Sequence, residues 1–296
     1  MTRRPPTQRA TSAPAARAGA SDQSAYWNGA GANRWSEGCN APDAVFAPIA
    51  ELLYARARPA PGERVVDVGC GCGATAVELA RRVGPTGRAV GVDISAAMIA
   101  EARRRAPAGG AAEFLVADAA THVFAPASID LLFSRFGVMF FADPALAFAN
   151  LRKATKRGGR LVFACWRELA RNPWHTVPLE AACKHVPRPR EPGPDEPGPF
   201  SLADEARLRR VLAAAGFVRV APTPVEFDLD LAAGKGFDAA VETPFHIGFA
   251  SRALENQPEA SRAAARGAIR AALAPYRRGA SVPLRAAIWI VEAVNP

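Results

Sequence analysis

Short apolar runs alternate with amphipathic stretches over the middle of the chain. Five runs rich in apolar residues each predict a strand: residues 63–71, 87–95, 112–118, 128–141 and 159–166. The stretches between them carry apolar residues at helical spacing and predict helices over residues 74–84, 96–106 and 144–159. This alternation predicts βαβ units and a parallel sheet that helices cover on both faces.

The later part of the chain departs from this alternation. Residues 187–200 contain six prolines in fourteen positions and predict a long surface loop. Residues 202–216 predict a further helix, and residues 217–230 and 284–294 predict the last two strands. The intervening residues 231–280 are rich in Ala, mostly helical in pattern, and predict an insertion at the edge of the sheet.

The first residues differ in composition from the rest. Residues 1–22 are rich in Ala, Pro, Arg and Ser and predict a disordered basic tail, whereas residues 23–296 are expected to form a single domain. The net charge is +9, and four of these charges come from arginines in the tail. Most of the others follow helical segments, where a solvated face is usual, so we expect no nucleic-acid partner.

Cysteine and histidine usage limits the chemistry. The five cysteines are odd in number and include no C-x-x-C pair, and the four histidines lack metal-ligand spacing. We therefore expect neither a disulfide framework nor a metal site. Such cysteine usage is typical of a reducing compartment, which favours a cytoplasmic location. No apolar run approaches the roughly 20 residues of a membrane span.

The most informative segment, VVDVGCGCGA, follows the first predicted strand at residues 65–74. Glycines at a strand-to-helix turn let the backbone approach a ligand, and the next helix offers unpaired N–H groups. Gly69, Gly71 and Ala74 satisfy the loose dinucleotide pattern G-x-G-x-x-A, and Gly73 adds a further glycine. Taken alone, the pattern also fits a nucleotide-dependent oxidoreductase.

Two acidic residues end later strands and sharpen this interpretation. Asp93 ends the second strand twenty residues after Gly73, where a carboxylate can accept hydrogen bonds from both ribose hydroxyls. Asp118 ends the third strand, where a carboxylate can accept a hydrogen bond from the amino group of adenine. Nicotinamide sites do not usually require that third acid, which disfavours the oxidoreductase.

In this order, the motifs VVDVGCGCGATAVELA, GVDIS, FLVADA and residues 134–163 resemble the class I S-adenosylmethionine-dependent methyltransferases. The resemblance is closest to the small-molecule, quinone-methyltransferase-like branch and covers about residues 26–220 and the final strand. It implies S-adenosylmethionine as cofactor and a doubly wound, Rossmann-like α/β fold. The expected sheet has seven mostly parallel strands, a final antiparallel strand and a partly helical cap.

The resemblance also implies roles in cofactor binding. The glycines face the methionyl part, Asp67 orders their loop and the cofactor amine, and Ser134 offers its carbonyl to that amine. Simple helix capping by Asp67 or Asp118, and a core role for Met98, stay open as alternatives. The implied cofactor residues are Asp67, Gly69, Gly71, Gly73, Asp93, Ile94, Met98, Asp118, Ala119 and Ser134.

The residues that would bind the methyl acceptor are less well defined than those that would bind the cofactor. Many relatives carry a histidine shortly after the strand-four serine, but residues 136–141 hold no proton carrier, which leaves His175 as the best-placed candidate base. Trp35, Arg135 and Trp174 are candidates to contact the acceptor. The sequence lacks the [ND]-P-P-[YF] signature of amino-group methylation, so we expect a small hydrophobic or aromatic acceptor and in-line transfer. An oxidoreductase or a non-catalytic cofactor-binding module are the alternatives.

Overall fold

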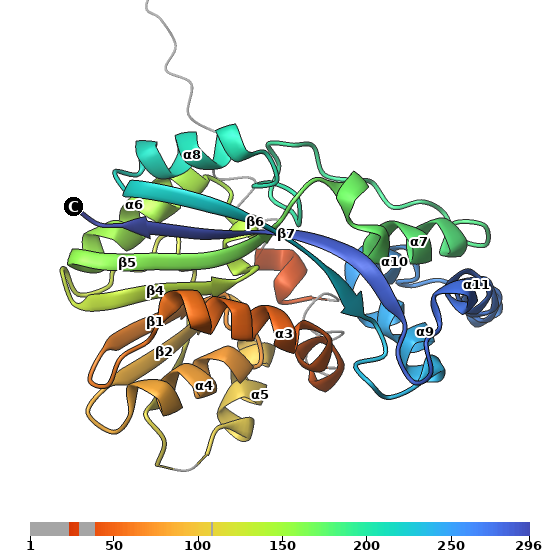
Figure 1. Cartoon of the computed structure of the whole chain (residues 1–296), viewed down its shortest axis with the longest axis horizontal. Helices are drawn as coiled ribbons and strands as arrows, with labels where there is room; N and C mark the ends of the chain where they lie inside the picture. Colours follow the sequence, from red (N-terminus) through yellow and green to blue (C-terminus); the bar gives the residue numbers. More distant parts are fainter. Residues whose placement is uncertain (1–23, 30–38, 108) are drawn as a thin grey trace, which may run out of the picture.

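A computed structural model of the chain describes residues 24–29, 39–107 and 109–296, so the predicted tail of residues 1–22 lies outside the described part. The strands form one seven-stranded sheet in the order β3-β2-β1-β4-β5-β7-β6 (Figure 1). Their bounds are β1 (Arg64–Val68), β2 (Arg88–Asp93), β3 (Ala112–Val116), β4 (Ile129–Arg135), β5 (Thr155–Trp166), β6 (Val218–Asp230) and β7 (Pro283–Val294).

Strand pairing confirms the expected fold class. Strands β1 to β5 pair in parallel, whereas β7 lies antiparallel between β5 and β6. The order reverses between β1 and β4, so the loops that follow these two strands diverge toward opposite faces. Such a switch point, at the carboxyl ends of the strands, is where open α/β sheets bind their ligands.

Helices flank the sheet, and several have side-chain caps. Ser95, Asp143 and Asp204 accept hydrogen bonds from backbone N–H groups in the first turns of α5, α6 and α8. No helix in the described ranges is both long and apolar enough to cross a membrane. The helices are α3 (Asn40–Ala57), α4 (Ala74–Val83), α5 (Ala96–Arg105), α6 (Pro144–Ala154), α7 (Pro173–Ala182), α8 (Glu205–Ala214), α9 (Phe237–His246), α10 (Gly248–Ala253) and α11 (Glu259–Leu273), with short 3-10 turns η1 (Gly137–Phe140), η2 (Leu169–Arg171) and η3 (Ala274–Tyr276).

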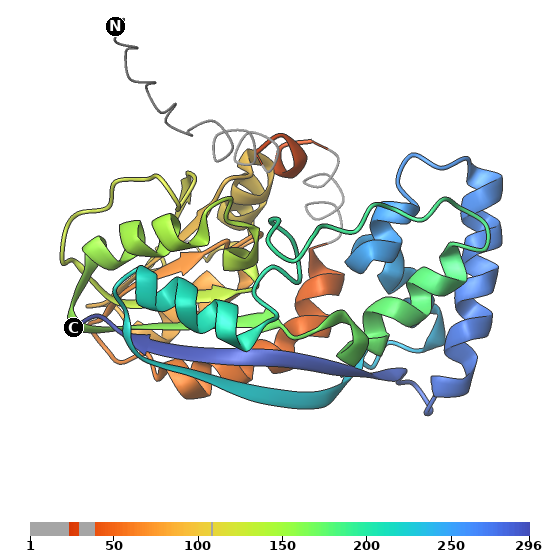
Figure 2. The same ribbon diagram turned by 90° about the horizontal axis from the view of Figure 1, so that it is seen from above.

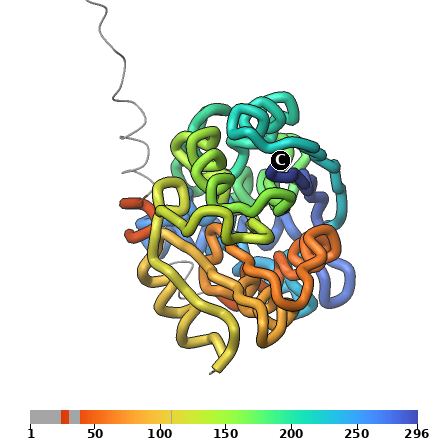
Figure 3. The backbone as a smooth tube through the Cα atoms, turned by 90° about the vertical axis from the view of Figure 1, so that its left-hand side faces the viewer, coloured from red at the N-terminus to blue at the C-terminus, as the bar shows by residue number. Residues whose placement is uncertain are grey.

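The core lies between the sheet and the helices on its two faces. Helices α3 and α4 cover one face, and α6 and α8 cover the other (Figures 1 and 3). On the first face Tyr54 of α3 stacks on Phe133 of β4, with ring centres 5.5 Å apart. On the second, Phe148 of α6 stacks on Phe163 of β5 at 5.6 Å. Each such buried ring contributes about 1.5–3 kcal/mol through apolar burial.

A separate group of helices lies beyond the carboxyl ends of the parallel strands. Helix α7 packs against α10 and α11, and α9 packs against both of them (Figure 2). We call α7, α9, α10 and α11 the helical cap. The proline-rich residues 187–200 run between α7 and α8 without regular structure.

Three local predictions differ from the structure. The run 128–141 is not one strand, because β4 ends at Arg135 and Phe136 adopts a left-handed conformation with φ 73° before η1. The helix predicted over residues 144–159 ends at Ala154, and Thr155 already pairs with Ile129 in the sheet. Helices α3 and α7 were not predicted. Apolar periodicity does not show where a chain turns to meet a neighbouring strand.

Gly137 is predicted to be irreplaceable, because an added Cβ would meet the backbone of Val68 and Gly69. We expect Gly137→Ala to lower the free energy of unfolding by about 1–3 kcal/mol, as overpacking of a rigid contact does. Gly267→Ala is the matched control, since its Cβ would meet nothing within 4 Å on an exposed helical face. It should raise stability by up to about 1 kcal/mol. Urea denaturation measures both changes, and equal effects would contradict the prediction.

Candidate functional site

The glycine loop of residues 69–73 joins β1 to α4 in a conformation that few other residues adopt. Gly69, Gly71 and Gly73 have φ values of 68°, 54° and 84°. A Cβ on Gly73 would lie 2.7 Å from the ring of Phe114, so this glycine permits packing against β3. A Cβ on Gly71 would meet only Met98, at 3.8 Å, and Gly71 lines a cavity. The three glycines therefore have different functions.

The glycine loop crosses the start of η1 at backbone contact distance. A Cβ on Gly69 would lie 2.6 Å from the Cα atom of Gly137. The buried hydroxyl of Ser134 joins the two segments: it donates to the carbonyl of Val68 at 2.8 Å and accepts from Gly137 N–H at 3.1 Å. Ser134 thus fixes the ends of β1 and β4 relative to each other.

Asp93 is the last residue of β2, and Asp118 comes shortly after the end of β3. Both lie at the same edge of the sheet. The carboxylate of Asp93 accepts hydrogen bonds from the N–H groups of Gly71 and Ser95, both at 2.9 Å. Burial raises its pKa, and these backbone donors act in the opposite direction. Asp118 accepts one hydrogen bond, from Ala120 N–H at 2.9 Å. Both acids line the cavity.

Asp67 lies beneath the glycine loop rather than in the cavity wall. It is fully buried, and one carboxyl oxygen accepts a hydrogen bond from the Thr75 hydroxyl at 2.5 Å. The other oxygen has no hydrogen-bond partner within the described part of the chain. Burial raises the pKa of Asp67 to about 7, although Thr75 and Arg135 oppose this shift. Asp67 therefore holds the loop from below.

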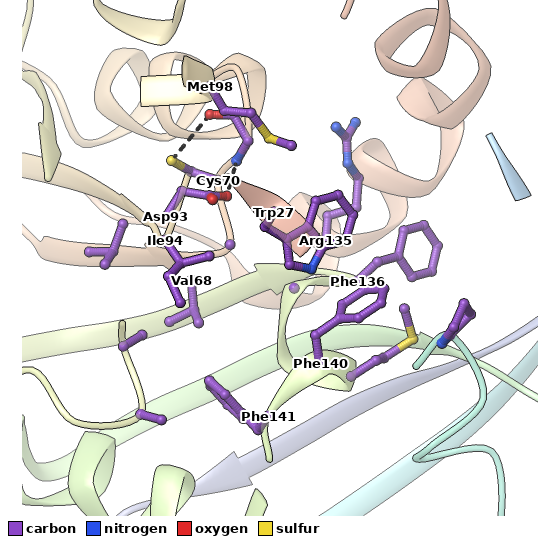
Figure 4. A pocket seen from close by; sticks show the side chains of 18 of the residues that line it. Trp27, Val68, Cys70, Asp93, Ile94, Met98, Arg135, Phe136, Phe140 and Phe141 are labelled. Carbon is purple, nitrogen blue, oxygen red and sulfur yellow. Dashed lines mark hydrogen bonds between the residues drawn. The ribbon is translucent and has the colours of Figure 1, made fainter. Parts of the chain in front are cut away.

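One cavity of about 460 Å³ extends from this loop to the helical cap. Asp93, Ile94 and Met98 lie at one end, and the guanidinium group of Arg135 points toward this side. The rings of Phe136 and Phe140 lie at the other end, beyond Trp27 (Figure 4). We call these two parts the loop end and the aromatic end. The volume falls in the range of pockets that hold cofactors and drug-sized ligands.

Aromatic rings from four elements form the aromatic end. Phe136 stacks on Trp166 with ring centres 4.3 Å apart, and Trp166 contacts Trp174 at 4.8 Å. Phe46 of α3 packs edge-on to Phe136 and Trp174, at 5.5 and 5.9 Å. Ile247 and Gly248 of the helical cap complete this wall. The arrangement suits a flat apolar ligand.

His175 is the one histidine in the described cavity wall, and it is buried without a partner. Neither ring nitrogen has a hydrogen bond within the described residues, and the ring packs against Phe249, with centres 4.4 Å apart. Burial lowers the pKa of His175 to about 3, so the imidazole is neutral near pH 7 and a weak base. Its unpaired nitrogens can still form hydrogen bonds with a ligand.

Arg135 forms an ion pair with Asp43 near the glycine loop. Its guanidinium group donates to one oxygen of Asp43 at 2.7 Å, and Arg105 donates to the other oxygen at 3.0 Å. Arg135 is the one cationic side chain among the described residues that line the cavity. Asp43 is thus shared by two cations.

Residues 24–29 lie over the loop end. The side-chain amide of Asn28 donates to the carbonyl of Ile94 at 3.1 Å, and its oxygen accepts from Ala96 N–H at 3.2 Å. Trp27 packs edge-on to Phe140, with ring centres 5.2 Å apart. These contacts place Trp27 in the cavity wall.

A disulfide between Cys39 and Cys72 joins the start of α3 to the glycine loop. The cysteine count and spacing did not predict this pairing, because it depends on the approach of segments 33 residues apart in sequence. Cys70, Cys165 and Cys183 are free. The cytoplasmic location expected from cysteine usage stays a prediction.

The structure brings most of the predicted site residues together around the cavity. Asp67, Gly73 and Ser134 are not among its lining residues but support the loops that form it. Trp35 lies outside the described residues. The predicted residues that line the cavity are Gly69, Gly71, Asp93, Ile94, Met98, Asp118, Ala119, Arg135, Trp174 and His175.

Sequence comparison agrees with this geometry. Residues 66–163 match the profile of a family described as "Methyltransferase domain". This match agrees with the resemblance of the sequence motifs to S-adenosylmethionine-dependent methyltransferases. It is 38% identical over 120 residues to aklanonic acid methyltransferase DauC of Streptomyces sp. (strain C5), which covers 40% of this chain and 54% of that protein. It is 34% identical over 118 residues to nocamycin O-methyltransferase of Saccharothrix syringae, and this match covers 39% of this chain and 42% of that protein. The chain spans about half the length of these curated relatives.

Structure comparison supports the fold of the methyltransferase domain. Phosphoethanolamine N-methyltransferase 2 of Haemonchus contortus, solved with S-adenosyl-L-methionine, superimposes with a TM-score of 0.57 at 17% identity. The match covers 93% of this chain and 60% of that one. At this level of identity, the similarity concerns the architecture alone.

The loop end fits S-adenosylmethionine, the cofactor of this family. Gly71 lets the backbone approach a ligand, Asp93 and Asp118 present carboxylates to hydroxyl and amino groups, and the orphaned oxygen of Asp67 lies below the loop. A cationic ligand would stabilise these buried carboxylates.

Sequence reasoning missed the contributions of α3 and of the helical cap. Asp43 and Phe46 come from α3, and Ile247 and Gly248 come from the junction of α9 and α10. The helical spacing of the buried Phe46, Ile49 and Leu53 was the signal that could have revealed α3. No local pattern could show that these residues border the cavity.

Asp67 should make the ligand-free protein less stable as the pH rises. Folding raises the pKa of Asp67 from 3.8 to about 7. The stability that this shift contributes is fully present below pH 3.8 and is lost between pH 3.8 and about pH 7. The loss is at most about 1.4 kcal/mol per pH unit. His175 has the opposite slope, because folding lowers its pKa from 6.5. The informative quantity is therefore the difference in the free energy of unfolding between Asp67→Asn and wild type at each pH.

We expect Asp67→Asn to gain stability relative to wild type between pH 5 and pH 7 and to hold that gain above it. Urea denaturation at each pH measures the difference. A difference that does not change with pH would show that Asp67 titrates normally.

Proposed function

We propose that the protein transfers the methyl group of S-adenosylmethionine to a small hydrophobic or aromatic acceptor. The observation that carries this proposal is the single cavity, which joins the glycine loop and two acids to a wall of aromatic rings. The cofactor and the acceptor would then meet within one cavity. The names of the similar enzymes, which act on aklanonic acid and nocamycin, support a small acceptor.

In this proposal the residues of the cavity act by binding and alignment. Bound S-adenosylmethionine supplies an activated methyl group. Asp93 would bind the ribose, Asp118 the adenine amino group, and Ile94 and Met98 the adenine faces. Trp27 and the helical cap would exclude water from the aromatic end. Alignment of two reactants in this way can supply roughly 7–11 kcal/mol of the rate acceleration.

Two other functions are less well supported. A nucleotide-dependent oxidoreductase would share the glycine loop, but the described residues form no second nucleotide-binding half. A non-catalytic cofactor-binding module would have no need of an aromatic compartment open to the loop end. Binding of NADH that is tighter than binding of S-adenosylhomocysteine would favour the oxidoreductase.

Asp93→Asn is expected to weaken the binding of S-adenosylhomocysteine at least about tenfold. Charge-assisted hydrogen bonds contribute about 1.5–3 kcal/mol each, and the amide keeps the size of the side chain while removing its charge. Titration calorimetry measures the affinity. Asp228→Asn, at an exposed position of β6, is the control and should bind as wild type does. Unchanged affinity in folded Asp93→Asn protein would exclude Asp93 as a ribose ligand.

Trp174→Ala is expected to reduce methyl transfer at least about tenfold while it changes cofactor affinity less than about threefold. The indole is buried in the aromatic wall, away from the glycine loop. The measurement uses an acceptor found by a screen with labelled methyl groups. Trp289→Ala removes an equally buried tryptophan outside the cavity wall and controls for lost stability. If both variants lose the same activity, Trp174 has no particular role with the acceptor.

A further inference from the structure

The disulfide between Cys39 and Cys72 lies at the loop end of the cavity. Cys39 directly precedes α3, and Cys72 lies in the glycine loop between Gly71 and Gly73. Both cysteines line the cavity, and 5% and 8% of their surface is exposed. Thiol–disulfide exchange requires access to a sulfur atom. Small thiols therefore have a route to this disulfide through the cavity.

The disulfide restrains the segment that would bind the cofactor. Glycines have more conformational freedom than other residues, so a loop with three of them loses more entropy when it becomes ordered. The N–H group of Gly71 donates to Asp93 at 2.9 Å, so the shape of the loop also fixes the proposed ribose ligand. A crosslink at Cys72 removes part of the loop's freedom before a ligand binds. Such preorganisation increases affinity.

A polar connection runs beside the disulfide. Arg105 donates to the carboxylate of Asp43 at 3.0 Å and to the carbonyl of Cys72 at 3.4 Å. Asp43 lies on α3 and also accepts a hydrogen bond from Arg135 at 2.7 Å. These contacts do not depend on the sulfur–sulfur bond, so α3 stays beside the loop when that bond is reduced. Reduction therefore loosens the loop without removing the site.

The three free cysteines are poor competitors for exchange. Thiol–disulfide exchange proceeds through the thiolate form of cysteine. Burial raises the pKa of Cys70 well above its usual range, and it also raises the pKa of Cys165, so both remain thiols near pH 7. Cys183 follows α7 and does not line the cavity. Exchange at this site is therefore confined to Cys39 and Cys72.

We propose that Cys39 and Cys72 form a reversible thiol–disulfide site that controls how tightly the loop end binds its cofactor. The disulfide form binds S-adenosylmethionine and S-adenosylhomocysteine tightly, and the dithiol form binds them more weakly. The reaction partner is a low-molecular-weight thiol and its disulfide. This inference rests on the cofactor site of the proposed function.

The exchange reaction balances with two small thiols. The thiolate of the first attacks one sulfur of the disulfide, the bond between the two protein sulfurs breaks, and the other protein sulfur leaves with the electron pair. The thiolate of the second then attacks the small-molecule sulfur of this mixed disulfide. The protein gains two electrons and two protons as two thiols, and the small molecules leave as their own disulfide.

Cofactor binding and the redox state influence each other reciprocally. If the disulfide form binds the cofactor more tightly, the bound cofactor must stabilise the disulfide by the same factor. The cofactor also occupies the cavity through which a small thiol reaches the sulfur atoms. We therefore expect saturating S-adenosylhomocysteine to protect the disulfide from reduction.

Titration calorimetry with S-adenosylhomocysteine tests the proposal on the wild-type protein in both redox states. Oxidised glutathione prepares the first state, and dithiothreitol prepares the second. Alkylation after denaturation should detect three thiols in the first state and all five in the second. We expect the affinity to be at least about fivefold lower in the reduced protein.

A redox titration measures the reciprocal effect independently. Glutathione buffers set the potential, and alkylation reports the fraction of disulfide with and without saturating S-adenosylhomocysteine. A fivefold difference in affinity corresponds to a shift of about 20 mV toward more negative potential, because a tenfold change is about 30 mV for a two-electron couple.

Two variants separate this disulfide from general effects of the reductant. Cys39→Ser removes the crosslink with little change in size, so it should bind with the weaker affinity of the reduced wild type under both conditions. Cys183→Ser is the matched control, because Cys183 is free and lies outside the cavity wall. It should keep the full difference between the two states. Urea denaturation verifies that both variants are folded.

Several outcomes would overturn the inference and leave the proposed function standing. These are five free thiols after oxidation, equal affinities in the two verified states, or tighter binding by the reduced form. A disulfide that increases the free energy of unfolding but leaves the affinity unchanged is structural only, and it overturns the inference as well. Failure to bind S-adenosylhomocysteine in either state would overturn the proposed function together with this inference.

Discussion

The whole site depends on the close contact between the glycine loop after β1 and the turn after β4. Gly69 and Gly137 approach so closely that neither has room for a Cβ atom, and Ser134 joins the two segments with hydrogen bonds. This contact occurs at the point where the strand order reverses. It sets the distance between the loop end, formed after β1 and β2, and the aromatic end, formed after β4 and β5.

Charge in the cavity follows from the same arrangement. The strands place three acids, Asp67, Asp93 and Asp118, in one region, where each accepts a hydrogen bond from a hydroxyl or a backbone N–H group, and Arg135 also favours the charged form of Asp67. A cationic cofactor suits such a region. Two guanidinium groups, those of Arg105 and Arg135, share the carboxylate of Asp43 close to this region.

The helical cap borders the cavity at the carboxyl edge of the sheet. It packs over the carboxyl ends of the strands (Figure 2). It supplies Trp174, His175 and Ile247 to the cavity wall. Burial has a chemical consequence, since it removes water from His175 and keeps the imidazole neutral. The histidine that resembled a base in the sequence is therefore better suited to hydrogen bonding.

The sequence by itself determined the features that depend on local pattern. Apolar periodicity showed the alternation of strands and helices, and glycine spacing showed the turn after β1. The positions of Asp93 and Asp118 at strand ends were enough to place them together, because the carboxyl ends of parallel strands share one edge. Only the tertiary structure decided the shared ion pair of Arg135, the Cys39–Cys72 disulfide and the placement of Asp67 below the loop. These features arise from burial and from contacts between segments distant in sequence, and no local pattern encodes either.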